Sequence, residues 1–403
     1  MADSPPGSQS ALRAANQRRV VAAIRSAGSL TQAEIARATG LSAATVSNIV
    51  NDLAATSLLR VTSTVSSGRR ARAVSVSRSA GLAIGIDFGR RHLRVAVADL
   101  AHEVLAEEQV PLPHQHRAEH GIDVAAGLVE RLLAQAGGDR AAVVGVGVGI
   151  PGPIDSRTGR IGASTILPEW VGVRPADAVR SRLDLPVHVE NDANLGVLAE
   201  VVWGCARGHR NAAYIKIATG IGAGLVINGQ LHRGVAGTAG EIGHTTIDER
   251  GRICRCGNRG CLETFASVPV ILGLLEQSHG ANLSVADVIR MARQGDIGCQ
   301  RVIEDVGRHL GVAVANLANL LNPQTIVIGG DLAAAGDLLL DPLRDVVRRF
   351  AIPSAAAVAD VVPSSLGSRA QVLGALALVF QEAEQGADGT LMPVSAQAVT
   401  RSA

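Results

Sequence analysis

The sequence predicts an α/β protein made of two unequal parts, a small N-terminal head and a much larger body. Over residues 81–385, short apolar runs alternate with helical stretches, which is typical of an open α/β sheet covered by helices. Residues 11–78 instead show helical patterns followed by two alternating segments around a turn. The 403 residues are 47% hydrophobic but only 2% aromatic, so the chain can bury more than one core of Ala, Val, Leu and Ile.

Charge and hydropathy limit the classes of function. No apolar stretch reaches the roughly 18–20 residues that span a bilayer, and the start lacks a signal-peptide pattern, so we expect a soluble cytoplasmic protein without a membrane partner. Residues 1–80 hold 10 basic and only 3 acidic side chains, whereas the remainder holds 28 basic and 33 acidic ones. A basic head on a slightly acidic body indicates that the head meets a polyanion.

The first two helices of the head have recognisable ends. Residues 11–27 form the first, with an expected apolar face of Leu12, Val20, Ile24 and Ala27. Thr31 and Glu34 then match a capping box, in which each side chain satisfies the other residue's backbone amide. The short helix that follows is expected to turn Ile35 and Ala38 inward and to stop at Gly40.

The third helix of the head has the character of a DNA-reading helix. Ser42 caps it, and its expected inner stripe is Val46, Ile49, Val50 and Leu53. Its outer face then carries small or uncharged polar side chains that can approach base edges. The candidate DNA-binding residues on this helix are Ser42, Ala43, Ala44, Thr45, Ser47 and Asn48.

Two alternating segments, 61–65 and 72–77, predict a β-hairpin after these helices. Its tip, 66–70, carries Arg69 and Arg70, like the wing of a winged helix-turn-helix, where arginines contact backbone phosphate without choosing sequence. The simpler alternative is a helical hairpin with a solvated basic loop. We favour DNA binding because the capping box, turn, apolar stripe, wing and charge asymmetry all agree.

Several strand ends in the body carry residues suited to ligands. The strand at 81–87 ends in Asp87 and Gly89 before a second strand at 93–98, and helices at 121–136 and 174–183 flank a buried run at 143–150. A strand at 185–189 delivers Asn191 and Asp192, where Asp192 is a candidate general base, with helix capping as an equally weighted alternative. The remaining candidates for holding phosphate, which could equally form tight turns, are Thr219, Gly220, Gly222, Gly329 and Gly330.

One cluster has the composition of a metal site. His244, Cys254, Cys256 and Cys261 follow the spacing H-x9-C-x-C-x4-C, which provides four nitrogen and sulfur ligands for a closed, structural zinc site. The alternative is three incidental thiols. Cys205 and Cys299 are isolated and are expected to be core residues. The single lysine, Lys216, is attributed to base composition rather than chemistry.

The order of these motifs resembles the ROK family (repressors, open reading frames and sugar kinases). The resemblance covers residues 81–385, and the segment from Glu241 through Cys261 to Glu263 is its most specific part. It implies the two-lobed actin-like ATPase (ribonuclease H-like) fold, with lobe 1 over about 81–190 plus the C-terminal helix and lobe 2 over about 191–365. The preceding winged helix, at 11–78, resembles the family's repressor branch. Residues 1–10 and 386–403 are expected to be disordered.

The family resemblance also implies roles for individual residues. In the family's sugar kinases the residue matching Asp192 is the catalytic base, and those matching Asn191, Asp192, Glu241, His244 and Glu263 bind sugar hydroxyls. His244 is expected to contact sugar and zinc together. The kinases carry Gly-Thr after Asp-x-Gly, but this chain has Arg90, Arg91 and His92, which crowd the phosphate turn.

Two main functions therefore remain open. The first is a transcriptional regulator, expected to be a repressor, that binds operator DNA as a homodimer or dimer of dimers and responds to a carbohydrate or sugar phosphate. The second is an ATP-dependent, glucokinase-like sugar kinase with a DNA-binding head, for which ATP and Mg²⁺ would be required. A third and weaker option is a body that recognises another protein.

Overall fold

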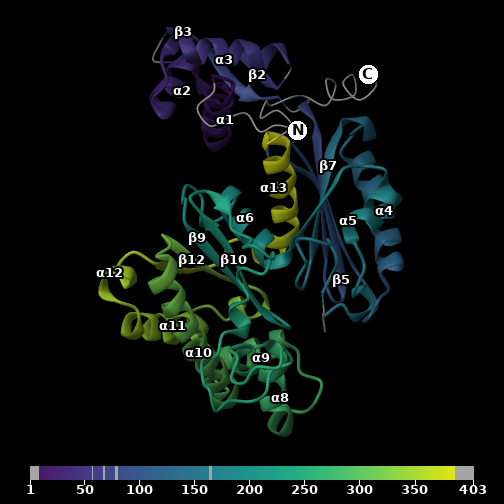
Figure 1. Cartoon of the computed structure of the whole chain (residues 1–403), viewed down its shortest axis with the longest axis vertical. Helices are drawn as coiled ribbons and strands as arrows, with labels where there is room; N and C mark the ends of the chain where they lie inside the picture. The colour runs from purple at the N-terminus through teal and green to yellow at the C-terminus, as the bar shows by residue number, and fades with distance from the viewer. Residues whose placement is uncertain (1–8, 57, 67–68, 78–79, 163–165, 386–403) are drawn as a thin grey trace.

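The computed structural model describes residues 9–56, 58–66, 69–77, 80–162 and 166–385 (Figure 1). The head contains three helices and a three-stranded sheet of order β1-β3-β2. Its elements are α1 (Gln9–Ala27), β1 (Leu30–Thr31), α2 (Gln32–Thr39), α3 (Ala43–Ala55), β2 (Leu59–Ser66) and β3 (Arg69–Val76). Residues 1–8 and 386–403, both expected to be disordered, lie outside the described residues, but Gln9 and Ser10 belong to α1.

The helix caps and the buried face of the third helix, predicted from the sequence of the head, are confirmed. Thr31 and Glu34 form the capping box of α2, and Gly40 ends that helix in the left-handed conformation at φ 67°. Ser42 caps α3 by accepting from the Thr45 amide at 3.1 Å. The four residues of the α3 stripe are buried, as predicted.

Three expectations for helix faces in the head were wrong. Leu12 is 62% exposed and Ala27 is also exposed, whereas α1 buries Ala14, Val20, Val21 and Ile24. On α2, Ala38 is exposed and Thr39 is buried in its place. The Thr39 hydroxyl donates to the Ile35 carbonyl at 2.7 Å, so the helix itself satisfies this polar group and permits its burial.

The body repeats one sheet topology in two lobes. Lobe 1 has the strand order β6-β5-β4-β7-β8 and lobe 2 has β11-β10-β9-β12-β13, so in each lobe the first strand pairs antiparallel with the second and parallel with the fourth. The strands of lobe 1 are β4 (Leu82–Phe88), β5 (His92–Asp99), β6 (Val104–Pro111), β7 (Val143–Ile150) and β8 (Val187–Asn191). Those of lobe 2 are β9 (Ala212–Ile217), β10 (Ile221–Ile227), β11 (Gln230–Leu231), β12 (Thr325–Gly329) and β13 (Asp360–Pro363).

Helices cover both sheets, and two of them fill the junction between the lobes. Helices α4 (Ala118–Gln135) and α5 (Pro175–Leu183) belong to lobe 1. Lobe 2 carries α7 (Glu263–Ala266), α8 (Val268–His279), α9 (Val285–Arg293), α10 (Ile297–Leu321), α11 (Asp337–Phe350) and α12 (Pro353–Ala356). The junction helices are α6 (Asp192–Val202) and α13 (Ala370–Gln385); α13 runs from the lobe junction toward the head (Figure 1). Among the described residues, no helix has the length and hydropathy of a membrane span.

Glycines bring α13 close to both lobe 1 and α6. A Cβ on Gly147 of β7 would overlap the Ala375 carbonyl of α13, and one on Gly374 of α13 would overlap the Leu195 carbonyl of α6. These close approaches leave no room for larger residues, so sheet, α13 and α6 pack as one stack. The predicted α/β architecture is confirmed, with two equivalent sheets and with α13 packed against β7 of lobe 1 and against α6.

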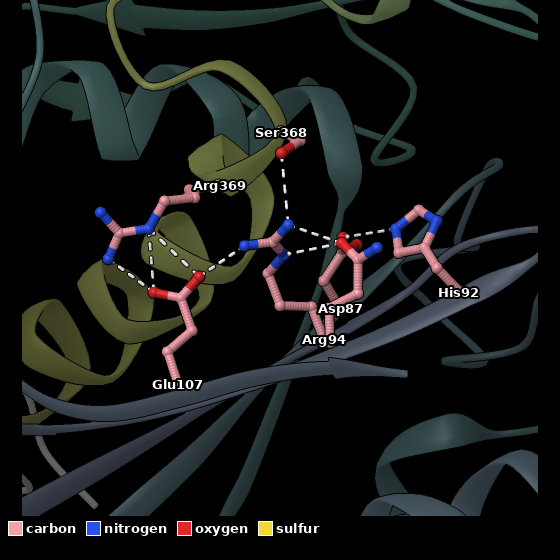
Figure 2. A network of polar contacts seen from close by, with 7 residues as sticks. Asp87, His92, Arg94, Glu107, Ser368 and Arg369 are labelled. Atoms are coloured by element: carbon pink, nitrogen blue, oxygen red, sulfur yellow. Dashed lines mark hydrogen bonds and ion pairs between the residues drawn. The ribbon is translucent and has the colours of Figure 1, made fainter. Parts of the chain in front are cut away.

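A polar network joins lobe 1 to the segment that enters α13 (Figure 2). Glu107 of β6 accepts from Arg94 of β5 at 2.5 Å and from Arg369 at 2.5 Å. Arg94 also donates to Ser368 Oγ at 3.2 Å. The side chains of Arg94 and Glu107 are only 14% and 15% exposed, so water screens their ion pair less than it screens a surface pair.

This network predicts a pH-dependent contribution to stability. Burial raises the pKa of Glu107, but hydrogen bonds from Arg369 and Arg94 outweigh it and hold the pKa below its usual range. Because the folded pKa is lowered, the stabilisation is present above the unfolded value of about 4.3 and is lost as the pH falls through the folded value. We expect Arg369→Ala to cost about 1 kcal/mol at pH 7 and less at pH 3.5, measured by urea unfolding.

The control for this prediction is Arg308→Ala, which removes two exposed ion pairs within α10, to Glu304 and to Asp305. It should cost less than Arg369→Ala at pH 7. A cost of Arg369→Ala that is the same at both pH values would contradict the assigned role of Glu107.

Candidate functional site

Most of the residues predicted to contact DNA are exposed at the start of helix α3. On α3, Ser42, Ala43, Ala44 and Asn48 are exposed, and Thr45 and Ser47 are partly exposed. Arg69 and Arg70 begin β3, where they pair with Ser66 and Val65 across the hairpin. The hairpin therefore places both arginines beside its tip, while tip residues 67 and 68 lie outside the described residues. The geometry of α3 and the hairpin is that of a winged helix-turn-helix.

The second candidate site lies where β8 meets α6. Asn191 caps α6, because its Oδ1 accepts from the Ala193 amide at 2.9 Å, while its Nδ2 donates to the Gly152 carbonyl at 3.0 Å. The capping alternative is therefore correct for Asn191. Glu190 accepts from Asn194 Nδ2 at 2.9 Å and from Arg233 Nε at 2.6 Å. These bonds fix the turn that presents Asp192 as the first residue of α6.

Asp192 has a charged partner that the sequence analysis missed. Lys216 Nζ, on β9, donates to Asp192 Oδ2 at 2.7 Å, and the two side chains are 21% and 13% exposed. Burial lowers the pKa of Lys216, but the carboxylates of Asp192 and Asp87 outweigh it and raise the pKa above its usual range. The available signal was a lone lysine inside an apolar strand, since buried charges require partners.

Glu241 and His244 face one another and lie near Asp192 and Glu263. His244 Nε2 lies 4.0 Å from Glu241 Oε2, and the other ring nitrogen, Nδ1, lies 3.5 Å from Cys254 Sγ. Burial raises the pKa of Glu241 above its usual range. The two nitrogens of His244 thus point to different neighbours, one toward a candidate sugar ligand and one toward the cysteines.

Glu263 is held by two donors. Arg255, which lies between two of the cysteines, donates from Nε to Glu263 Oε1 at 2.6 Å and from Nη2 to Oε2 at 3.0 Å. The Ile221 amide also donates to Oε2, at 3.2 Å. The cysteine loop therefore positions Glu263 through Arg255, a residue that the sequence analysis did not single out.

The cysteine cluster has the dimensions of a tetrahedral zinc site. The ligand atoms of His244, Cys254, Cys256 and Cys261 all lie within 4.8 Å of one another, and Cys256 Sγ is 3.7 Å from Cys261 Sγ. Two sulfurs at about 2.3 Å from a tetrahedral centre are about 3.8 Å apart, and a sulfur and a nitrogen about 3.6 Å. The Cys256–Cys261 separation and the 3.5 Å between Cys254 Sγ and His244 Nδ1 match these values, so the four residues fit a metal ion.

The other cysteines do not join this cluster. Cys299 is buried, as expected, and follows Asp296, whose carboxylate caps α10 by accepting from the Cys299 amide at 2.8 Å. Cys205 is only partly buried and lies against Glu200, with Sγ 3.2 Å from Oε2. The expectation of a core position therefore holds for Cys299 and only in part for Cys205.

The glycine turns predicted to hold phosphate contact protein instead. A Cβ on Gly329 would overlap the Tyr214 side chain, one on Gly330 would overlap the Ile217 backbone, and one on Gly220 would lie 2.8 Å from Glu263 Oε2. Gly222 packs more loosely, against Ala193. Thr219 lies in the turn between β9 and β10. Close packing within the protein thus explains why glycine is required at Gly220, Gly329 and Gly330. Nucleotide binding by these turns stays a prediction.

The turn after Asp87 is covered by a side chain. The His92 ring lies over Gly89, where it would overlap an added Cβ, and its Nε2 is 3.2 Å from Asp87 Oδ2 (Figure 2). Asp87 itself is 3% exposed. The crowding inferred from the sequence therefore has a specific cause, which is the position of this imidazole.

Helix α6 connects the candidate sugar site at Asp192 to the head. It begins at Asp192 and ends beside Trp203, whose Nε1 donates to the His102 carbonyl at 3.1 Å. His102 stacks on Phe380 of α13 with ring centroids 4.1 Å apart. Burial, followed by the charges of Arg25 and Arg207, lowers the pKa of His102 to about 2, which places Arg25 of α1 close to this aromatic cluster.

Apolar packing also continues across this boundary. One hydrophobic cluster includes Ile24 and Val76 of the head together with Leu100, Leu376 and Phe380 of the body. A shift of α6 or α13 would therefore change the surface on which the head rests.

Comparison with family models identifies both parts of the chain. The model described as the ROK family matches residues 83–382, and the model described as the MarR family matches residues 13–70. These ranges correspond to the two-lobed body and to the winged head.

Relatives are found among both regulators and enzymes. The chain is 31% identical to a xylose repressor of Bacillus subtilis over 374 residues, covering 92% of this chain and 96% of the relative. It is 35% identical to a glucokinase of Halalkalibacterium halodurans over 315 residues, covering 74% of this chain and 95% of the relative. The repressor thus matches head and body, whereas the shorter match to the glucokinase leaves about a quarter of this chain uncovered.

Solved structures also include a regulator that matches the whole chain and an enzyme that matches only the body. A ROK family transcriptional regulator, described as a homologue of the E. coli MLC protein, aligns with a TM-score of 0.78 and 28% identity over 96% of this chain and 99% of its own. A ROK family glucokinase from Streptomyces griseus, in complex with glucose and AMPPNP, aligns with a TM-score of 0.64 and 30% identity over 75% of this chain and 100% of its own. The chain therefore belongs to the ROK family and, with its MarR-type winged helix, is a homologue of xylose repressors and Mlc-like transcriptional regulators.

Proposed function

We propose that this protein is a sugar-responsive transcriptional repressor that acts in the cytoplasm, bound to operator DNA at the nucleoid. The carrying observation is that one chain combines a winged head with hydroxyl-binding groups that come together from the junction of β8 with α6 and from lobe 2. Carboxylates, amides and imidazoles suit sugars because each hydroxyl both donates and accepts hydrogen bonds. The proposed sugar ligands are Asn191, Asp192, Glu241, His244 and Glu263.

A structural zinc ion held by His244 and the three cysteines supports this cleft. When bound, the ion would cross-link the loop that contains Arg255 to the short helical turn that contains His244. His244 and Glu263 would thereby be held in place for a sugar. In this arrangement zinc is required for sugar affinity and takes no part in a reaction.

The contacts of α6 supply a route from cleft to head. A sugar that binds Asp192 and groups on lobe 2 would favour one separation of the lobes. Because α6 begins at Asp192 and ends beside Trp203, the same movement would reach the aromatic cluster near Arg25. We propose that this movement changes the spacing of two heads in a homodimer, as a two-fold symmetric operator requires.

The second candidate is a glucokinase-like sugar kinase, favoured by the 35% identity to a glucokinase. Phosphoryl transfer depends on accurate positioning of phosphate at the turn after Asp87. In this chain the His92 ring covers Gly89 in that turn. The repressor is therefore the better supported function, and ATP and Mg²⁺ would be needed only for the kinase.

A titration with a sugar panel tests the proposal. Trp170 and Trp203 are the two tryptophans of the chain, so the Trp170→Phe variant leaves Trp203 as the sole reporter. We expect xylose, glucose or a related neutral sugar to bind with micromolar to millimolar affinity, by calorimetry, and to change Trp203 fluorescence. Coupled ADP release should stay at background. Absence of heat with every sugar would contradict the effector site, and turnover of about 1–100 s⁻¹ would favour the kinase.

A further inference from the structure

The two lobes place opposite charges at equivalent positions. Asp87 is the second-last residue of β4, the first strand of lobe 1, and lies opposite Gly149 on the parallel neighbour β7. Lys216 is the second-last residue of β9, the first strand of lobe 2, and lies opposite Gly329 on the parallel neighbour β12. The repeated topology therefore directs a carboxylate from one lobe and an ammonium from the other toward the junction.

Lys216 acts on two carboxylates at this junction. Its Nζ donates to Asp192 Oδ2 at 2.7 Å, and the negative charge of Asp87 also favours its protonated form. Asp87 is 3% and Asp192 9% exposed as whole residues, so both carboxylates are largely removed from water. Two such carboxylates without a cation would repel one another strongly in a medium of low dielectric constant.

Paired carboxylates at the strand ends of an α/β cleft commonly hold Mg²⁺ for phosphoryl transfer. Mg²⁺ requires about six oxygen ligands at 2.0–2.1 Å and usually retains several waters. An ammonium bonded to Asp192 occupies one of the required oxygens and supplies the positive charge that would otherwise attract the metal. His92, bonded to Asp87, occupies an oxygen of the other carboxylate.

We propose that Lys216 is a permanent internal counter-cation that takes the place of a metal–nucleotide complex between Asp87 and Asp192, so that the cleft binds a neutral sugar alone. In this role Lys216 is a positioning residue, and it keeps one oxygen of Asp192 directed at the protein and the other available to accept from a sugar hydroxyl. The sugar part of this inference rests on the proposed function, but the exclusion of the metal does not.

The test uses the full-length, zinc-loaded protein and measures Mn²⁺ binding by electron paramagnetic resonance, with and without AMPPNP. The wild type should show no Mn²⁺ site of submillimolar affinity beyond the zinc cluster. Lys216→Met should gain a site that binds Mn²⁺ at least about tenfold more tightly, because the competing positive charge is removed. Lys216→Arg, which keeps the charge, should behave like the wild type, and adding Asp87→Asn to Lys216→Met should abolish the new site.

Two outcomes would overturn the inference. One is tight Mn²⁺–AMPPNP binding by the wild type, which needs no variant to interpret. The other is a Lys216→Met protein with native circular dichroism and no gain in Mn²⁺ affinity. Failure of every sugar to bind, with the Mn²⁺ results as expected, would instead contradict the proposed function and leave the role of Lys216 intact.

Discussion

Ala44→Glu is expected to weaken operator binding by at least about 100-fold while leaving the fold intact. Ala44 is exposed in the first turn of α3, the helix that would enter the major groove. A carboxylate there would face the DNA, whose phosphates repel it. The same carboxylate is favourable for the isolated helix, because it lies near the positive end of the helix dipole.

Fluorescence anisotropy with labelled duplexes measures this effect, and circular dichroism confirms folding. The matched control is Ala22→Glu, which makes the same charge change at an exposed position of α1. It should weaken binding by no more than a few-fold, through long-range electrostatics that salt removes. Equal losses for the two variants would show that α3 does not read DNA.

Cys261→Ser should have the second large effect, on the cleft rather than on the head. Cys261 is fully buried, and its Sγ lies 3.7 Å from that of Cys256. Removing one of four ligands should release zinc, and with it the Arg255 loop that holds Glu263. We expect sugar affinity to fall at least about 100-fold and the thermal midpoint of the body to fall by several degrees.

The matched control is Cys205→Ser, which changes a thiol outside the cluster. It should keep its zinc, measured by atomic absorption, and its sugar affinity. The account of the cluster fails if Cys261→Ser retains a full equivalent of zinc or binds sugar like the wild type.

Local sequence signals predicted the elements whose stabilising contacts lie close in the chain. The Thr31–Glu34 capping box, the Ser42 cap and the stripe of α3 depend on neighbours three or four residues away, and all three are confirmed. The central strands β4, β5, β7 and β12 were also found, because buried strands are continuously apolar. The unpredicted strands β6, β11 and β13 lie at sheet edges and carry half-exposed, mixed sequences.

The site contained contacts that no local pattern could predict. Lys216 and Asp192 are 24 residues apart, and outside the site Arg369 likewise meets Glu107 across 262 residues. The grouping of His244 with the three cysteines was predictable because these residue types at this spacing are restrictive. The pairing of Asp192 with Lys216 and of Glu190 with Arg233 depends instead on how distant segments fold together, which composition does not specify. Arg255 meets Glu263 within the cysteine loop, eight residues along the chain.

The central claim is that a sugar in the cleft controls the DNA affinity of the head. The most direct test is an anisotropy titration of operator duplex with the wild-type protein, with and without a saturating sugar identified in the panel. The account predicts that the sugar changes operator affinity at least about fivefold and that operator changes sugar affinity by the same factor, because coupling between two binding sites is reciprocal. Superimposable operator titrations in the presence and absence of a bound sugar would contradict it.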